Sequence, residues 1–252
     1  MAGNLLELKD VSKAFGAHKV LDRISFGLSA GEIVGLLGPN GSGKSTALNV
    51  ISGFLPSDGG EIRLEGDNIT NVSAQRITGH GLVRTFQLPS MPHRMTVREV
   101  LQAGASGNAS LASMLKPFRF DDELDELLES FRLTHVADLP ASALSGGQKK
   151  LLSVATALRS KPKLLCLDEP TAGVHPNLRA DMVTILKRYR DKGVAILVVE
   201  HDMLFIRELC SRCVVLDRGE IIADCAPREL EDNARVVEAY LGKAVEKGKV
   251  AL

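Results

Sequence analysis

The chain has 252 residues, of which 44% are hydrophobic and 25% charged, and its formal net charge is zero. This length and composition are typical of a globular protein with one large core, or with one core and a smaller lobe. The balanced charge argues against nucleic acid as the main partner, because binding phosphates requires a positive surface. No apolar run approaches the ~20 residues that cross a membrane, and no signal-peptide pattern is evident, so we expect a cytosolic protein.

Four cysteines are present. Cys210 and Cys213 form a C-x-x-C pair, a spacing found in zinc and redox sites. No second pair is available to complete a zinc site, and Cys213 begins the apolar run CVVL. The sequence therefore favours burial of these cysteines as small hydrophobic residues.

The first elements in chain order are two segments that alternate apolar and polar residues, Leu5–Ser12 and Lys19–Phe26. This period predicts antiparallel strands with one face in water. Phe15 lies between them in KAFGAHK, in a predicted loop.

A short apolar strand, Ile33–Leu37, leads into GPNGSGKST, which matches the P-loop pattern. Its residues are Gly38, Pro39, Asn40, Gly41, Ser42, Gly43, Lys44, Ser45 and Thr46. Glycines let backbone N–H groups approach a triphosphate, and the helix that follows adds the positive end of its dipole. Lys44 can reach the β and γ phosphates and the Ser45 hydroxyl can ligate Mg²⁺. In this context Phe15 either stacks on adenine or fills its loop.

The next predicted elements are a strand at Glu61–Leu64, a helix at Ser73–Gly79 with Ser73 as N-cap, and a strand at Gly81–Gln87. Pro89 and Pro92 then exclude a helix. From Thr96, whose pairing with Glu99 forms a capping-box pattern, the chain turns helical, with a further helix at Asp121–Phe131. Between these helices, Gly104–Ser113 predicts a loop or frayed helix. We expect a helical lobe at about 88–143, inserted into an α/β core.

The second half of the sequence predicts further helices and strands. They are a helix at Lys149–Leu158 after LSGGQ, a buried strand at Lys163–Asp168, a helix from Pro176, a buried strand at Ala195–Val199, a hairpin of Cys213–Leu216 and Glu220–Asp224, and a helical segment at Pro227–Leu241. In parallel sheets, ligands bind where strands end. Four polar strand ends should therefore converge, at Gly38, Gln87, Asp168–Glu169 and His201.

Asp168 and Glu169 follow the apolar residues LLCL. This is the Walker B pattern, in which the Asp holds Mg²⁺ and the Glu can orient and polarise the attacking water. LSGGQ at Leu144–Gln148 lies between this motif and the P-loop, and this combination resembles the ATP-binding subunit of an ABC transporter. The resemblance covers residues 5–242 and leaves 243–252 as a frayed tail. It implies a P-loop core, an antiparallel β-lobe and a helical lobe.

The resemblance also implies roles for individual residues. Phe15 matches the adenine-stacking aromatic, Gln87 the Q-loop glutamine that ligates Mg²⁺, Glu169 the catalytic glutamate, and His201 the switch histidine that contacts the γ-phosphate. Ser145, Gly146, Gly147 and Gln148 match the signature that contacts ATP bound by the other subunit, and a Ser-Gly-Gly helix N-terminus is an anion site. One residue departs from the pattern: His175 occupies the position where most of the family has an Asp.

Four strings resemble the subfamily that serves importers of branched-chain amino acids, urea and amides: VRTFQ, PTAGVHP, VEHDM and VVEAYLG. The resemblance implies ATP and Mg²⁺, a second ATPase subunit in a head-to-tail dimer, permease subunits on the Gln87 loop, and an extracytoplasmic solute-binding protein. It places the chain peripherally at the cytoplasmic face of the plasma membrane. The alternatives are the ATPase of a lipid or lipopolysaccharide exporter, which shares the EHD stretch, and a soluble ABC ATPase acting on ribosomes or DNA.

Overall fold

The computed structural model describes residues 4–87, 90–105 and 121–248, and these residues form an α/β protein. Its strands are β1 (Leu6–Phe15), β2 (His18–Leu28), β3 (Ile33–Leu37), β4 (Gly59–Leu64), β5 (Asp67–Asn68), β6 (Leu82–Arg84), β7 (Leu164–Asp168), β8 (Ala195–Val199), β9 (Arg212–Asp217) and β10 (Glu220–Cys225). Its helices are α1 (Lys44–Ile51), α2 (Ala74–Gly79), α3 (Val97–Gly104), α5 (Asp122–Ser130), η1 (Thr134–Val136), η2 (Ala141–Ala143), α6 (Gly146–Arg159), α7 (Pro176–Asp191), α8 (Met203–Leu209), η3 (Pro227–Glu229) and α9 (Ala234–Gly248).

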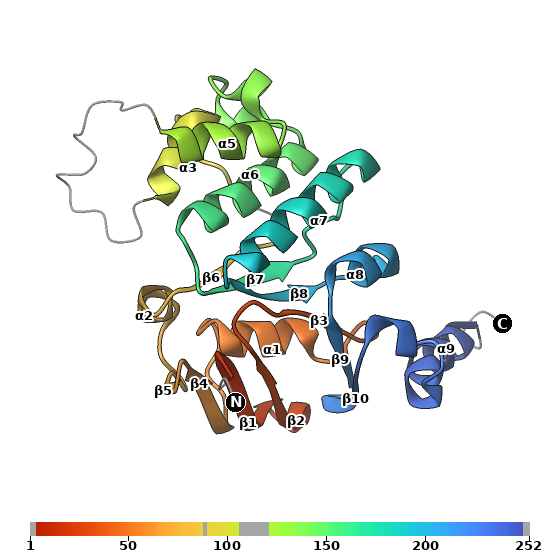
Figure 1. Ribbon diagram of the computed structural model, residues 1–252. Helices are drawn as coiled ribbons and strands as arrows, with labels where there is room; N and C mark the ends of the chain where they lie inside the picture. Colours follow the sequence, from red (N-terminus) through yellow and green to blue (C-terminus); the bar gives the residue numbers. More distant parts are fainter. Residues whose placement is uncertain (1–3, 88–89, 106–120, 249–252) are drawn as a thin grey trace.

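A six-stranded sheet in the order β10-β9-β3-β8-β7-β6 forms the centre of the molecule (Figure 1). All its neighbouring strands are parallel except the β9–β10 hairpin. β3, β8, β7 and β6 are consecutive neighbours, so their carboxyl ends lie along one edge. The predicted convergence of four strand ends is therefore confirmed.

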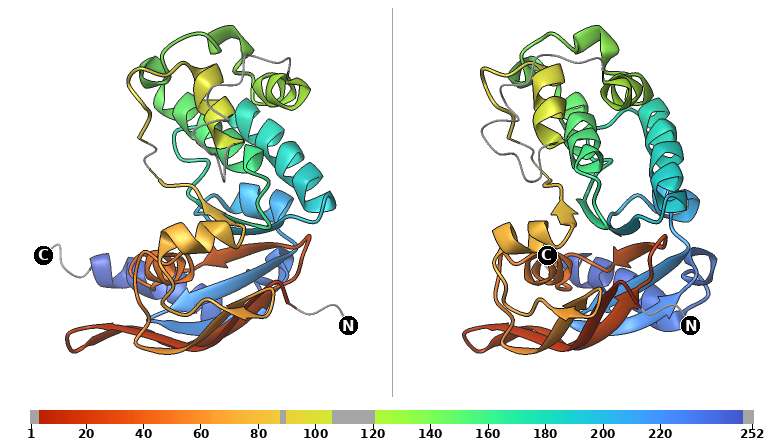
Figure 2. Two further views of the ribbon diagram at one scale, coloured as in Figure 1. Left: turned by 90° about the vertical axis from the view of Figure 1, so that its left-hand side faces the viewer. Right: turned by 60° about the vertical axis from the view of Figure 1, so that its left-hand side comes forward.

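Side chains of the central strands point alternately into two hydrophobic cores. On β3, Val34 and Leu36 join the core that contains α1 and the antiparallel strands. Ile33 and Leu37 join the core on the opposite face, with residues of α6, α7 and α8. The sheet and α1 therefore lie between the antiparallel strands and the helical lobe, as both views of Figure 2 show.

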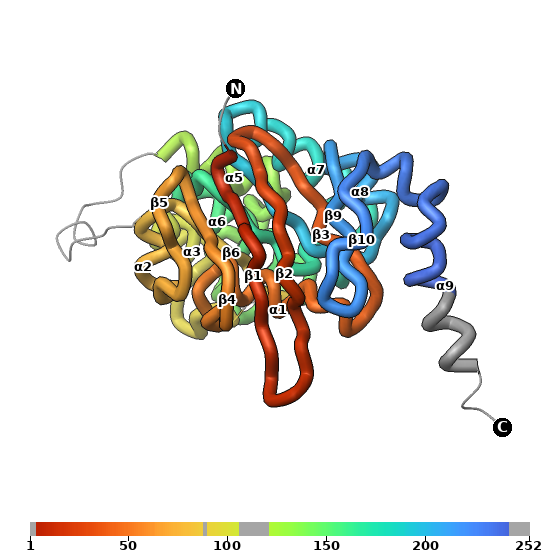
Figure 3. The backbone as a smooth tube through the Cα atoms, turned by 90° about the horizontal axis from the view of Figure 1, so that it is seen from below, coloured from red at the N-terminus to blue at the C-terminus, as the bar shows by residue number. Residues whose placement is uncertain are grey.

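The antiparallel lobe is a four-stranded sheet in the order β2-β1-β4-β5. Its β1–β2 hairpin projects from the body of the molecule (Figure 3). The hairpin is tighter than predicted: Phe15 is the last residue of β1 and pairs with His18, so it does not lie in a loop. Gly16 makes this turn possible, because it adopts a left-handed φ of 60°.

The helical lobe begins with α3, where Thr96 and Glu99 form the predicted capping box. Asp121 caps α5, and three leucines of α5 are buried against the lobe's core. Most of the predicted loop or frayed helix at Gly104–Ser113 lies outside the described residues. Because α3 and α5 both pack against α6, the core of the lobe continues beyond residue 143.

Several predicted boundaries differ from the observed ones, and those of β6, α6 and α9 are examples. β6 ends at Arg84 rather than Gln87, because it is an edge strand and the chain leaves it towards Glu169. α6 begins at Gly146 rather than Lys149, because Ser145 caps it and includes the glycines in the helix. α9 continues to Gly248, into the range expected to be frayed. Among the described residues, no helix is long and apolar enough to span a membrane.

Cys166, Cys210 and Cys213 are buried, as predicted, and Cys225 is partly exposed. Burial raises the pKa of the Cys166 and Cys213 thiols to about 12 and raises the pKa of Cys210 well above its ordinary value. Among the described residues, no group of three or more His, Cys, Asp or Glu side chains is arranged to hold a metal. The C-x-x-C pair packs beside Gly35, where a Cβ would lie 3.3 Å from the Cys213 sulfur and 3.4 Å from the Cys210 sulfur.

We expect these buried thiols to resist alkylation. The thiolate is the reactive form, and with a pKa of about 12 only about one thiol in ten thousand is ionised at pH 8. Iodoacetamide followed by peptide mass spectrometry should label Cys225 first in the native protein, and all four cysteines after denaturation. Rapid native labelling of Cys210 or Cys213 would contradict their packing role.

Candidate nucleotide-binding and catalytic site

The P-loop connects β3 to α1 and holds Lys44 against its own backbone. The Lys44 ammonium donates to the carbonyl oxygens of Gly38 (2.7 Å) and Pro39 (3.0 Å). Lys44 is only 6% exposed, whereas Ser45 next to it lies exposed on the first turn of α1. A buried cation and exposed N–H groups at a helix N-terminus form a site suited to phosphate.

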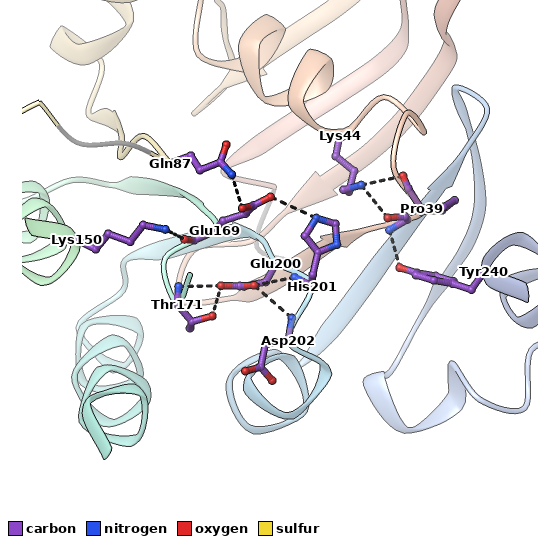
Figure 4. A network of polar contacts seen from close by, with 11 residues as sticks. Pro39, Lys44, Gln87, Lys150, Glu169, Thr171, Glu200, His201, Asp202 and Tyr240 are labelled. Atoms are coloured by element: carbon purple, nitrogen blue, oxygen red, sulfur yellow. Dashed lines mark hydrogen bonds and ion pairs between the residues drawn. The ribbon is translucent and has the colours of Figure 1, made fainter. Parts of the chain in front are cut away.

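Gly38 begins the P-loop at a place where a side chain does not fit. Its φ is 142°, and a Cβ would lie 2.1 Å from the carbonyl oxygen of Leu216 on β9. Its N–H donates to the hydroxyl oxygen of Tyr240 on α9 (2.9 Å; Figure 4). Burial raises the pKa of Tyr240, so the hydroxyl stays neutral. The loop is thereby fixed by two elements from the other end of the chain.

Glu169 lies at the centre of the site, between Gln87 and His201 (Figure 4). The Gln87 amide nitrogen donates to one carboxylate oxygen (2.6 Å), and His201 Nε2 lies 3.3 Å from the other. The Glu169 backbone adopts a left-handed φ of 47°, and its N–H donates to the carbonyl of Val199 (2.8 Å). Such strained backbone in non-glycine residues is concentrated at functional sites. The structure thus brings three predicted site residues together.

Asp168, the last residue of β7, is held by Arg84 of the neighbouring strand β6. Arg84 Nη2 lies 2.9 Å from Asp168 Oδ2, and both side chains are largely buried. The predicted metal ligands Ser45, Gln87 and Asp168 offer a hydroxyl, an amide and a carboxylate oxygen. Oxygen donors of these types suit Mg²⁺, which takes one or two carboxylates together with substrate phosphates and water.

Several residues that organise this site escaped the sequence analysis. The buried Glu200 accepts hydrogen bonds from the N–H and hydroxyl of Thr171 and from the N–H groups of His201 and Asp202. It therefore connects the loop after Glu169 to the loop that carries His201. The only signal for this role in the sequence is the polar residue that directly follows the apolar run AILVV.

Lys150 on α6 donates to the carbonyl oxygen of Glu169 (2.6 Å). Burial lowers the pKa of the Lys150 ammonium, and the carboxylates of Glu169, Glu200 and Asp168 oppose this change. Nothing in the pattern LSGGQKK distinguishes this lysine from Lys149. The contact connects the start of α6 to Glu169, the predicted catalytic residue.

The signature residues lie at the N-terminus of α6. Ser145 and Gln148 form a capping box, with the Gln148 N–H donating to the Ser145 hydroxyl (3.3 Å) and the Ser145 N–H donating to the Gln148 amide oxygen (3.0 Å). A Cβ on Gly147 would lie 2.7 Å from the carbonyl oxygen of Gly173, so the signature packs closely on the loop after Glu169.

His175 caps α7, with its Nδ1 accepting from the Asn177 N–H (3.3 Å). An Asp would serve the same capping role, which is a physical reason why this position accepts either residue.

Phe15 is 53% exposed, and Lys13 Nζ lies 5.7 Å from its ring centroid. The β1–β2 hairpin reaches the P-loop through backbone bonds from Asp22 to Gly219 and from Gly219 to Ser42. Phe15 is therefore on an exposed hairpin anchored beside the P-loop, and its contact with adenine stays a prediction.

Comparison with known proteins identifies the family to which this chain belongs. Residues 21–172 match the family model described as ABC transporter. The chain belongs to the ABC transporter ATPase family. It is 38% identical to the "Probable branched-chain amino acid transport ATP-binding protein LivG" of Archaeoglobus fulgidus, over 94% of this chain and 95% of the relative. It is 32% identical to the lipopolysaccharide export system ATP-binding protein LptB of Escherichia coli, over 94% and 97% of the two chains.

Solved structures agree with this family. The ADP conformation of MJ1267, an ATP-binding cassette of an ABC transporter, superposes with a TM-score of 0.81 at 35% identity, and the match covers 95% of this chain and 99% of that one. The predicted α/β fold of an ABC cassette is confirmed. The chain is an ABC-type ATPase that binds nucleotide, and the P-loop is the predicted binding site.

We expect Lys44→Ala to weaken ATP binding as well as turnover, because it removes the buried cation beside the phosphate-binding backbone. The loss in affinity should be at least about tenfold, or about 1.4 kcal/mol, measured by isothermal titration calorimetry. Lys9→Ala, which removes an exposed lysine on β1, is the matched control and should bind ATP normally. Unchanged affinity in Lys44→Ala would contradict its assigned role.

Proposed function

We propose that this ABC ATPase drives import of branched-chain amino acids or related small polar solutes through a membrane permease. The observation that carries this proposal is the hydrogen bond between Gln87 and Glu169. Gln87 begins the segment predicted to contact the permease, and Glu169 is the predicted catalytic carboxylate. A movement of the permease that displaces Gln87 would therefore change the environment of the group that activates water.

The proposed roles follow from the position of each group. Lys44 neutralises phosphate charge. Glu169 accepts a hydrogen bond from the attacking water and so orients it. His201, on the other side of Glu169, is placed to contact the γ-phosphate. Ser45, Gln87 and Asp168 would hold Mg²⁺, which supplies charge neutralisation between the phosphates when bound.

The exposed signature supports a head-to-tail dimer with a second ATPase subunit, either a copy or a paralogue. Ser145 lies exposed, and the N–H groups of the first turn of α6 form an anion site. The chain carries one P-loop and one signature. A partner subunit would place its own signature against ATP held by this P-loop.

Two hollows beside the Gln87 segment support docking of a permease helix. One has a volume of about 350 Å³ and lies between Phe54, Phe86 and α2. The other, of about 330 Å³, is lined by Phe86, Met91, Pro92 and residues of α3 and α6. Apolar hollows that meet at an exposed aromatic side chain suit the apolar face of a helix.

The similarity to LivG favours an importer as the complex. An importer would also include an extracytoplasmic solute-binding protein, and the ATPase would lie at the cytoplasmic face of the membrane. The similarity to LptB supports a second candidate, an exporter of lipid or lipopolysaccharide. The importer and the exporter would use the same ATPase chemistry and would differ in the membrane subunits that bind the two hollows.

We expect Glu169→Gln to bind ATP normally, to lose hydrolysis and to trap the dimer. The amide retains the shape of the side chain but removes the negative charge that polarises water, and the loss of a general base costs about 10²- to 10⁴-fold. Phosphate release and size-exclusion chromatography with and without ATP measure the two effects. Hydrolysis at the wild-type rate would show that Glu169 is not the base.

The transport assignment is tested by affinity purification of the ATP-trapped Glu169→Gln protein from native membranes in mild detergent. Mass spectrometry should identify a permease pair, with a second ATPase or none, and a solute-binding protein that takes branched-chain amino acids, urea or amides. Membrane subunits of a lipid exporter would overturn the cargo and the direction. Ribosomal proteins or DNA without a permease would overturn transport itself.

A further inference from the structure

Arg84 is a buried cation at the junction of three parts of the active site. Its side chain is 6% exposed at the end of β6. Nη1 donates to Asn49 Oδ1 (2.7 Å) and Ser52 Oγ (3.0 Å), which belong to α1 and its C-cap. Nη2 donates to Asp168 Oδ2 (2.9 Å). One planar group therefore joins the helix that follows the P-loop to the predicted metal ligand.

The same guanidinium contacts two aromatic rings at the surface. Its central carbon lies 5.7 Å from the ring centroid of Phe54 and 5.3 Å from that of Phe86. The two rings meet edge to face, with centroids 5.3 Å apart and planes at 88°. Phe54 is 55% exposed and Phe86 is 46% exposed. The two rings together therefore form an exposed apolar patch next to the Gln87 segment.

We infer that Arg84 is a positioning residue, which orients Asp168 for Mg²⁺ and connects it to the aromatic pair Phe54–Phe86 on the surface beside Gln87. This inference rests on the proposed roles of Asp168 and of the two hollows. It adds a second route from the permease surface to the nucleotide, besides the bond between Gln87 and Glu169.

The physical basis is the rigid geometry of the guanidinium. The planar guanidinium bonds α1 and its C-cap through Nη1 and Asp168 through Nη2. It thereby fixes the carboxylate relative to the helix that follows the P-loop. Partners behind a metal ligand hold its orientation, and losing one lowers metal affinity. A partner helix that shifts either aromatic ring would also shift the stacked guanidinium, and Asp168 with it.

A buried arginine with acidic partners can also serve stability alone, and the chain contains a matched example. Arg159 at the end of α6 is likewise 6% exposed and is paired with Asp121 and Glu123 of the helical lobe. Its side chain is as buried as that of Arg84 and is paired with two carboxylates instead of one, and neither of these partners belongs to the predicted active site. Arg159→Lys therefore measures how much the loss of a buried guanidinium group lowers the stability of the fold.

The first experiment compares Arg84→Lys with Arg159→Lys and wild type. Thermal unfolding reports on stability, calorimetry without Mg²⁺ reports on ATP binding, and ATPase assays report on the Mg²⁺ concentration for half-maximal rate. We expect Arg84→Lys to raise that concentration about tenfold, with metal-free ATP binding within about twofold of wild type. Arg159→Lys should lower the melting temperature without changing Mg²⁺ dependence. Equal effects of the two variants on Mg²⁺ dependence, or none in Arg84→Lys, would overturn the inference.

Asp168→Asn, assayed in parallel, separates this inference from the proposed function. If Asp168→Asn leaves Mg²⁺ dependence unchanged, the metal assignment fails, and the inference with it. If Asp168→Asn changes the dependence and Arg84→Lys does not, only the role of Arg84 is overturned.

The second experiment measures the connection to the surface without turnover. The chain contains no tryptophan, so Phe54→Trp introduces a single tryptophan at the position whose ring lies beside Arg84. We expect Mg²⁺, added with a non-hydrolysable ATP analogue, to change its emission, and we expect Phe54→Trp/Arg84→Lys to lose this change at saturating Mg²⁺. A response that persists in the double variant, or that is absent from Phe54→Trp alone, would contradict the connection. Phe54 is suited to this test because it lies outside the segment that carries Gln87.

Discussion

The parallel pairing of β3, β8, β7 and β6 brings the predicted catalytic residues together. Parallel neighbours end at the same edge of the sheet, so four loops that are far apart in the sequence meet there. The strands themselves are apolar on both faces, since each side is covered by a core. Polar residues can therefore occur only where the strands end, and this places Lys44, Gln87, Glu169 and His201 within one site.

Buried polar groups then fix the loops relative to one another. Glu200 uses both carboxylate oxygens to bond the backbone around Thr171 and His201. Lys150 bonds the Glu169 carbonyl from the helical lobe, and Arg84 bonds Asp168 from the edge strand. In a site of low dielectric constant these bonds are strong, and an unpaired partner would be costly. Side chains outside the predicted phosphate contacts thus hold the loops of the site in position.

The sequence predicted most of this fold because its signals are local. β3 and β8 have the predicted bounds, since uninterrupted apolar runs flanked by polar residues leave little freedom. The Thr96–Glu99 capping box formed as expected because its geometry depends on four consecutive residues. The convergence of Gln87, Glu169 and His201 followed from the rule that parallel strand ends meet.

What the sequence could not predict depends on contacts between distant residues. Phe15 extends β1 because its pairing with His18 closes a tight hairpin, which alternation alone does not reveal. Arg84 and Lys150 look like ordinary charged residues until the sheet and α6 bring them to Asp168 and Glu169. The hydroxyl of Tyr240 meets Gly38 only because α9 returns to the P-loop, and no periodicity carries that information.

The contact between Gly38 and Tyr240 has a consequence for how the protein matures during synthesis. The P-loop is made early, yet its central strand β3 is flanked by β8 and β9, and the Gly38 N–H is bonded by a residue 202 positions later. Domains fold as units while the chain leaves the ribosome from its N-terminus. The nascent P-loop therefore lacks these neighbours until the residues up to Tyr240 have emerged from the ribosome.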